Sequence, residues 1–255
     1  MKKVILVIVD GLGYEYAENR MGFLQHLVEN RKATFHKVIG ELPTLSRPMY
    51  ETILTGKPVC IHGITQNSMS RLSNQRNLFK CVREKGLGTA CAAYYWMSEL
   101  YVNAPFNRLT DRFLNNLDKD IQHGIFYWAE SYPDSHVYYD AEYLRREYSP
   151  EFLLIHTMGV DTAGHKYSRS SSEYRNSMLI NDQYLAGMMN LWLEDDYVVL
   201  VTGDHGINDD FQHGGTLPCE REVPLWVIGE NHIEIGNVIS QLEIAPLVLK
   251  IMDVE

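Results

Sequence analysis

Residues 3–13 read KVILVIVDGLG, an apolar run that ends at an acid flanked by glycine. The β-branched run Lys3–Val9 is typical of a strand buried on both faces of a parallel sheet. Similar runs follow at Thr89–Tyr95, Phe152–Thr157, Tyr197–Thr202 and Pro224–Ile228. Helical patterns lie between them at Tyr16–Asn30, Asn74–Lys85, Ser171–Glu194 and Leu242–Met252. This alternation predicts an α/β fold, a three-layer α/β/α sandwich around a mostly parallel central sheet.

Length and composition fit one domain spanning residues 1–255. A chain of 255 residues can bury a substantial core within a single α/β domain. Its net charge of −10 argues against binding a nucleic-acid polymer, which needs clustered Lys and Arg. The N-terminal apolar run lacks a small-residue cleavage site, and no stretch approaches the roughly 18 apolar residues of a membrane span. The four cysteines show no CxxC spacing, so we expect reduced thiols in a cytoplasmic protein with no membrane partner.

The stretch from residue 96 to residue 150 breaks the alternation of strands and helices. It is dense in Tyr, Phe and Trp and also rich in Asn and Asp. We interpret it as a small aromatic-rich insertion over the site. Its aromatic side chains are expected to form a small core of their own rather than a platform for a substrate.

Three of the predicted strands are each followed by an acid. Asp10 follows the first strand, Asp161 follows the strand LLIHT, and Asp204 follows VVLVTG. In doubly wound sheets the ligand site lies beyond the carboxyl ends of the strands. We therefore expect three carboxylates at one edge of the sheet, although any one of them alone could simply cap the next helix.

Histidines accompany these acids at short spacing. His165 ends the motif D-x-x-G-H that begins at Asp161, His205 directly follows Asp204, and His213 comes eight residues later. The glycines beside them permit bends that turn adjacent side chains to one edge. Mixed carboxylate and imidazole ligands favour zinc, and manganese or iron would fit the same set. The sequence therefore predicts two divalent metal ions.

Ser46 precedes the short helical pattern RPMYETILTG. Its hydroxyl can be read as an ordinary helix N-cap. It can equally be a nucleophile at a helix N-terminus, where the dipole and the free N–H groups favour a phosphoryl anion. Pro48, just inside the helix, fits both interpretations.

The ordered set of motifs resembles the alkaline phosphatase superfamily, and most closely its type I phosphodiesterase/nucleotide pyrophosphatase branch. That branch carries a strand ending in an acid, then P-T-x-T/S-x-P, T-G and H-G-I, and later D-x-x-G-H, D-H-G and a final histidine. Here the corresponding residues are PTLSRP at 43–48, TG at 55–56 and HGI at 62–64. Arg47 stands where the branch usually has an aromatic residue.

The resemblance implies a role for each motif residue. Asp161, His165 and His213 would bind one metal ion, and Asp10, Asp204, His205 and the Ser46 oxygen would bind the other. Asn67 falls where the branch places a donor to a nonbridging phosphoryl oxygen, and the backbone N–H of Arg47 would be its companion. In this pattern His62 belongs to a structural turn. His156, inside a predicted strand, is expected to pack in the core.

We therefore predict a two-metal-dependent phosphoric ester hydrolase of the phosphodiesterase or nucleotide pyrophosphatase type. It would act on a small phosphorylated substrate through a phosphoryl-serine intermediate at Ser46. Three ligand carboxylates against two dications leave one positive charge, which matches a diester monoanion better than a monoester dianion. A phosphomonoesterase is the first alternative, because Arg47 is a candidate for the additional cation. A phosphomutase and a non-catalytic metal-binding protein are further alternatives.

Overall fold

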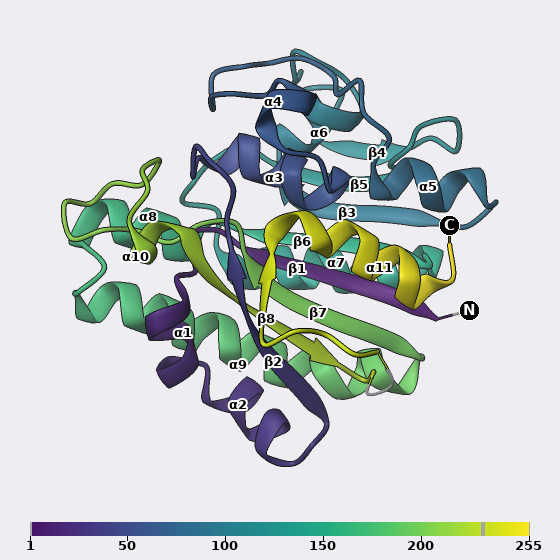
Figure 1. The fold of residues 1–255 in the computed structure, drawn as a ribbon. Coiled ribbons are helices and arrows are strands. Elements are labelled where there is room, and N and C mark those ends of the chain that lie inside the picture. Colours follow the sequence, from purple (N-terminus) through teal and green to yellow (C-terminus); the bar gives the residue numbers. More distant parts are fainter. Residues whose placement is uncertain (1, 231–232, 255) are drawn as a thin grey trace.

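The computed structural model describes residues 2–230 and 233–254, which build a nine-stranded sheet between two layers of helices (Figure 1). The strands are β1 (Lys3–Val9), β2 (Ala33–Ile39), β3 (Thr89–Tyr94), β4 (Phe113–Asn115), β5 (His123–Tyr127), β6 (Phe152–Thr157), β7 (Tyr197–Gly203), β8 (Glu222–Ile228) and β9 (Val238–Ser240). Their order in the sheet is β4-β5-β3-β6-β1-β7-β8-β2-β9. The predicted α/β class with a mostly parallel sheet is confirmed.

The centre of the sheet is parallel and its margins are mixed. Strands β5, β3, β6, β1 and β7 all run in the same direction, whereas β8 runs antiparallel to β7 and to β2. At one edge β9 lies parallel to β2, and at the other β4 lies antiparallel to β5. The apolar run of β1 therefore occupies the central position, where both faces of a strand are covered.

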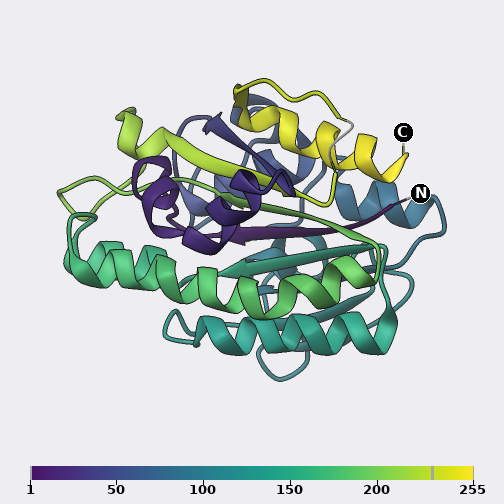
Figure 2. The same ribbon diagram turned by 90° about the horizontal axis from the view of Figure 1, so that it is seen from below.

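Each face of the sheet carries its own helices and its own hydrophobic core (Figure 2). One face packs against α3 (Ser46–Thr55), α5 (Leu78–Glu84), α6 (Trp96–Tyr101) and α11 (Ile244–Met252). The opposite face packs against α1 (Tyr14–Arg20), α2 (Gly22–Glu29), α7 (Asp134–Tyr148), α8 (Gly159–Tyr167) and α9 (Ser172–Glu194). The remaining helical elements are short: α4 (Val59–His62), α10 (Pro218–Arg221) and the 3₁₀ helix η1 (Gln241–Glu243). The alternation of side chains along each strand divides the apolar residues between these two cores.

Some helices begin or end at other residues than predicted, because side chains from distant parts of the chain cap them. The pattern expected to form one helix over Tyr16–Asn30 forms α1 and α2, with a break at Met21. The Asp182 carboxylate of α9 accepts hydrogen bonds from the backbone N–H groups of Phe23 and Leu24, so α2 begins against α9. Such capping satisfies N–H groups that have no partner within the helix.

The aromatic stretch 96–150 differs from the expected insertion over the site. Strand β5 pairs in parallel with β3, and β4 pairs with β5, so both extend the central sheet. Helix α7 packs against β3 and β6 on the face that it shares with α9. The segment was misinterpreted because β5 has only five residues and its sequence, HGIFY, begins with histidine and glycine.

Among the described residues, no helix combines the length and the apolar character needed to cross a bilayer.

Candidate metal centre and nucleophile

Three neighbouring parallel strands bring the three predicted acids together. Val9 of β1 pairs with Thr157 of β6 on one side and with Gly203 of β7 on the other. Asp10 and Asp204 therefore leave the sheet side by side, and Asp161 arrives in the first turn of α8. All three side chains are buried. The sheet edge predicted from the sequence is thus a cluster of carboxylates.

Each of these carboxylates has one buried oxygen without a hydrogen-bond partner, namely Asp10 Oδ1, Asp161 Oδ1 and Asp204 Oδ2. Burial is the main cause that raises their pKa values: that of Asp10 to about 7 and those of Asp161 and Asp204 well above the usual range. Repulsion between the carboxylates acts in the same direction. A buried anion without a partner is costly, so this cluster is suited to a bound cation.

The three predicted imidazoles all present Nε2 to this cluster, because the other ring nitrogen, Nδ1, is bonded to a backbone carbonyl. The Nδ1 atoms of His165, His213 and His205 lie 2.7, 2.7 and 3.1 Å from the carbonyl oxygens of Phe211, Thr44 and Gly206. A carbonyl oxygen can only accept, so each Nδ1 carries the proton and each Nε2 offers a lone pair. Partners of this kind on the distal nitrogen orient histidines that bind metals.

Two of these lone pairs face each other at short range. The Nε2 atoms of His165 and His213 lie 3.1 Å apart. Two acceptors at this distance repel each other unless a proton or a metal ion lies between them. Burial lowers the pKa of His213 to about 4, so its ring is neutral near pH 7. A cation bound by both nitrogens would remove the repulsion.

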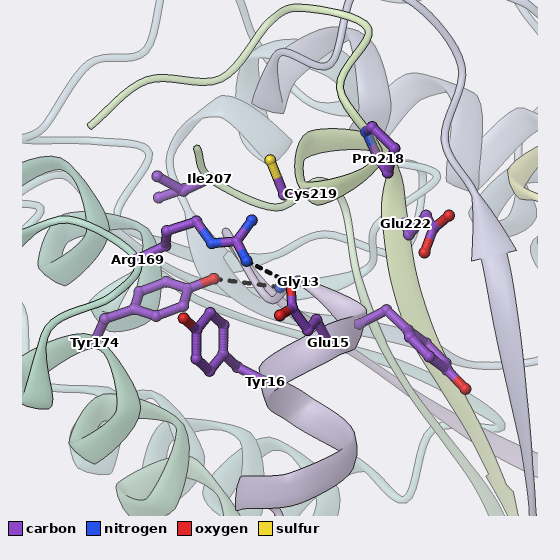
Figure 3. A pocket seen from close by; sticks show the side chains of 10 residues that line it. Gly13, Glu15, Tyr16, Arg169, Tyr174, Ile207, Pro218, Cys219 and Glu222 are labelled. Carbon is purple, nitrogen blue, oxygen red and sulfur yellow. Dashed lines mark hydrogen bonds and ion pairs between the residues drawn. The ribbon is translucent and has the colours of Figure 1, made fainter. Parts of the chain in front are cut away.

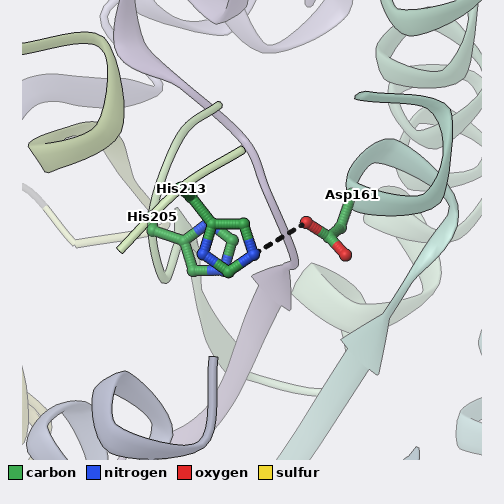
Figure 4. Close-up of side chains that lie close together, drawn as sticks. All are labelled: Asp161, His205 and His213. Carbon is green, nitrogen blue, oxygen red and sulfur yellow. Dashed lines mark ion pairs between the residues drawn. The ribbon is translucent and has the colours of Figure 1, made fainter. Parts of the chain in front are cut away.

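Two groups of side chains could each hold a metal ion, and His205 belongs to both. One group is Asp161, His205 and His213 (Figure 4); the other is Asp10, Asp204 and His205. The Nε2 atom of His205 lies 3.4 Å from Asp10 Oδ1 and 3.3 Å from Asp204 Oδ2. Burial holds the pKa of His205 well below its usual value, so these approaches are not ion pairs. The neutral ring of His205 and the two carboxylates point at a common position, as the ligands of a metal ion do.

His165 lies at the exposed margin of the cluster. Its Nε2 atom is 3.4 Å from Asp161 Oδ1, and its side chain is 37% exposed. The predicted division of the ligands put His165 with Asp161 and His213 and gave His205 to the other metal ion. The structure brings all six side chains into one cluster, in which His205 is the shared member.

Ser46 directs its hydroxyl at this shared histidine. It is the first residue of α3, with Leu45 at the N-cap position and no side-chain capping bond. The Ser46 Oγ lies 3.1 Å from His205 Nε2, and because that nitrogen carries a lone pair, the hydroxyl donates. In the first turn Pro48 has no N–H and the Arg47 N–H donates to Asn67, so the positive potential beside the hydroxyl comes from the helix dipole. Ser46 is therefore not the N-cap of α3, and its hydroxyl faces the cluster of carboxylates and imidazoles instead.

Arg47 and Asn67 lie beside the hydroxyl. The backbone N–H of Arg47 donates to Asn67 Oδ1 at 3.0 Å. That bond uses the carbonyl oxygen of the amide, so the Asn67 donor that remains is Nδ2. The Arg47 guanidinium is buried and forms an ion pair with Glu99 at 2.7 Å. The structure therefore brings both predicted residues together, with the Arg47 N–H orienting Asn67.

Two residues that contact Asp10 were not predicted to belong to the site. Tyr50 donates from its hydroxyl to Asp10 Oδ2, and His156 Nε2 lies 3.1 Å from the same oxygen. The backbone N–H of Tyr94 approaches His156 Nδ1 at 3.4 Å, which leaves the proton of His156 on Nε2. His156 is fully buried, as expected, but it also supports the acid. The spacing i, i+4 from Ser46 to Tyr50 on one helix face was an available signal.

The turn after Asp10 is held from α9. Tyr174 donates from its hydroxyl to the carbonyl of Gly11 at 2.6 Å. The same hydroxyl accepts from the N–H of Gly13 at 3.4 Å (Figure 3). Gly11 has a φ of +74°, and a Cβ there would lie 2.7 Å from the Cα of Asp161. Only glycine permits this approach between the β1 turn and α8.

His62 lies in a turn, as predicted. Its Nδ1 accepts from the N–H of Ile64 at 3.1 Å, and its Nε2 lies 3.1 Å from Thr52 Oγ1. These contacts connect the turn after α4 to α3, so the role is structural.

A parallel-centred sheet with carboxylates, imidazoles and a serine at its carboxyl edge defines the class of alkaline-phosphatase-like proteins. Within this class, the chain belongs to the type I phosphodiesterase/nucleotide pyrophosphatase family, whose model matches residues 4–214. The family lies in the alkaline phosphatase superfamily, as the sequence motifs predicted.

Solved structures share the fold, and curated relatives match most of the chain. The fold is similar to that of murine ectonucleotide pyrophosphatase/phosphodiesterase 5, with a TM-score of 0.75, 12% identity and coverage of 100% of this chain and 96% of that chain. The alkaline phosphatase TAB5 gives a TM-score of 0.67 at 13% identity and covers all of both chains. The catalytic subunit of human GPI ethanolamine phosphate transferase 3 is 22% identical over 270 residues, which is 96% of this chain. The match spans only 24% of that relative's length.

Proposed function

We propose that the protein is a two-metal-dependent phosphodiesterase in which Ser46 is the nucleophile. The observation that carries the proposal is the position of the Ser46 hydroxyl, 3.1 Å from the Nε2 of His205. That histidine belongs to both groups of potential metal ligands. A serine in the first turn of a helix, beside two such groups, combines a nucleophile with binding sites for phosphoryl oxygens.

The side chains fit the two metal ions that the family implies. Asp161, His165 and His213 would hold one, and Asp10, Asp204 and His205 would hold the other together with the Ser46 oxygen. The orphaned carboxylate oxygens and the opposed imidazole lone pairs support this assignment. The mixed donor set is consistent with zinc. When bound, the ions would lower the pKa of the serine hydroxyl and stabilise the charge on the leaving oxygen.

The proposed reaction has two steps, in which Ser46 and Asn67 take part. The Ser46 oxygen attacks phosphorus, and the bond from phosphorus to the leaving oxygen breaks as the new ester bond forms. The Asn67 Nδ2 group donates to a nonbridging oxygen, and the N-terminal dipole of α3 stabilises the charge on the nonbridging oxygens. Water then attacks the phosphoryl-serine, which restores the hydroxyl and releases the second product.

The surroundings of Arg47 favour a diester over a monoester. A monoester dianion would need a cation beyond the two metal ions, and Arg47 was the candidate. Its guanidinium forms a buried ion pair with Glu99 at 2.7 Å and donates to the carbonyl of Met69 at 2.6 Å. These bonds occupy its charge within the protein, so the monoester alternative loses its main support.

A second candidate function is transfer of the phosphoryl group to an alcohol instead of water. It is favoured by the likeness to the GPI ethanolamine phosphate transferase over 96% of this chain. Both reactions share the attack by Ser46 and differ in the second step, in which a hydroxyl acceptor would replace water.

The test is turnover of p-nitrophenyl esters by metal-loaded wild type and Ser46→Ala. Bis-p-nitrophenyl phosphate, p-nitrophenyl phosphate and a p-nitrophenyl nucleotide ester should be compared with zinc or manganese present. We expect diester hydrolysis that falls by at least about 10³-fold in Ser46→Ala, because the covalent step is lost. Metal content should remain largely unchanged. Full activity in Ser46→Ala would refute the nucleophile.

The nucleotide ester is included because the murine relative has been solved in complex with AMP. Added ethanolamine or glycerol distinguishes the two candidate functions. A new phosphodiester product would identify a transferase, and an unchanged product ratio would identify a hydrolase.

A further inference from the structure

We propose that Glu99 is a positioning residue that acts through Arg47 and the loop at residues 63–77 to fix Asn67 beside Ser46. The inference rests on the proposed function and extends it to a residue outside every motif of the sequence. Glu99 lies on α6, far along the chain from both the nucleophile and Asn67.

The loop that carries Asn67 has little structure of its own. Residues 63–77 contain no helix or strand between α4 and α5. Long loops without regular backbone bonds depend on side-chain contacts for their position. A donor that must meet a phosphoryl oxygen within tenths of an ångström therefore needs anchors close to it in the loop.

Two anchors lie two and three residues after Asn67. The Arg47 Nη1 donates to the carbonyl of Met69 at 2.6 Å, and the Ser70 hydroxyl donates to Glu99 Oε1 at 2.8 Å. The Arg47 Nη2 joins the two by donating to Glu99 Oε2 at 2.7 Å. Both oxygens of Glu99 are thus engaged in holding the loop.

The far ends of this chain of contacts are held by further interactions. The Glu99 Oε1 also accepts from the N–H of Phe106 at 3.0 Å, and Trp96 of α6 stacks beneath the Arg47 guanidinium at 4.7 Å. Arg47 itself directly follows Ser46, and its backbone N–H orients the Asn67 amide at 3.0 Å. The ion pair therefore fixes the positions of Ser46, the loop and the Asn67 amide relative to one another.

Stability alone is a weak reason for such a pair. The Arg47 and Glu99 side chains are only 2% and 6% exposed. The desolvation of two charges often offsets their attraction, and apolar residues in the same place can be equally stable. The directional bonds to Met69 and Ser70 give the pair a geometric function that apolar packing would not supply.

The experiment is a double-mutant cycle on the metal-loaded full chain with bis-p-nitrophenyl phosphate as the probe. It compares wild type, Glu99→Gln, Asn67→Ala and the double variant. We expect Glu99→Gln to lower kcat about 10- to 100-fold with little change in KM, since small misplacement of a catalytic donor has effects of this size. In the Asn67→Ala background the same change should lower kcat less than about 3-fold.

A matched control is Glu142→Gln, which breaks another largely buried pair. Glu142 binds Arg145 at 2.8 Å within α7, on the opposite face of the sheet. It should lower thermal stability, because Arg145 loses the charge of Glu142 and keeps only that of Asp195, and it should leave kcat unchanged. An equal fold loss from Glu99→Gln in both backgrounds, or an unchanged kcat, would overturn the inference.

Failure of the proposed function has a different signature, because turnover would then persist in Ser46→Ala. If no ester is turned over, the affinity of the metal-loaded variants for inorganic phosphate, measured by calorimetry, decides the question. Glu99→Gln should weaken phosphate binding several-fold in the wild-type background and leave it unchanged in the Asn67→Ala background. Equal weakening in both backgrounds, or none in either, would exclude the positioning role.

Discussion

Replacement of Asp10 by asparagine should stabilise the metal-free protein and destabilise the metal-loaded one. Asp10 Oδ2 accepts from Tyr50 and His156, whereas Oδ1 has no hydrogen-bond partner. The amide oxygen of Asp10→Asn can keep both bonds. Its NH₂ group would take the place of Oδ1, 3.4 Å from His205 Nε2, whose lone pair it would share with the Ser46 hydroxyl. The substitution thus exchanges a buried carboxyl, which has one unpaired oxygen, for a neutral amide of similar shape.

The size of the effect follows from the pKa of the acid. Burial raises the pKa of Asp10 from 3.8 to about 7 in the folded protein. A raised pKa means that the contribution to stability is complete below pH 3.8 and is lost as the pH rises to about 7. At 1.36 kcal/mol per pH unit, the loss is about 4 kcal/mol at pH 7 and roughly 2 kcal/mol at pH 5. The stability gained by Asp10→Asn should therefore grow by about 2–3 kcal/mol over this range.

The assay is urea denaturation of chelator-treated wild type and Asp10→Asn between pH 5 and pH 7.5. The difference between the two proteins cancels the contribution of the buried histidines, which titrate in both. Saturating zinc is the internal control: there the substitution should be destabilising, because a ligand is lost and binding no longer favours the folded state as strongly. A difference without pH dependence, or a metal-free variant less stable than wild type at pH 7.5, would refute the reasoning.

Two further predictions concern the support of the site. Tyr50→Phe removes one bond to Asp10 and should weaken zinc binding about 10- to 100-fold, measured by competition with a chromophoric chelator; unchanged affinity would contradict this role. Gly206→Ala places a Cβ 2.1 Å from the backbone oxygen of Cys219, so about 1–3 kcal/mol of stability should be lost in a calorimetric scan. Gly187→Ala is the control, since nothing lies within 4 Å of its Cβ and stability should stay equal or rise.

The centre of the fold was predictable because three long apolar runs lie next to one another. The strands β1, β6 and β7 are buried on both faces, so their sequences begin or continue with at least four consecutive apolar residues and their positions are clear. The acids at or near those ends could be assigned to one edge from the direction of the strands alone. The margins of the sheet were less readable: β2 alternates in burial, β5 is short, and both depend on pairing with strands distant in sequence.

The metal ligands were predictable from local sequence, whereas the residues that support them were not. Asp10, Asp204 and His205 follow strand ends, and local sequence is enough to place them. His156 reaches Asp10 because β6 lies beside β1, and Glu99 reaches Arg47 because α6 packs against α3, so their partners are set by tertiary packing. Short motifs therefore reveal which atoms can bind metal. The geometry that makes those atoms reactive depends on long-range contacts, and a single sequence gives no local signal for such contacts.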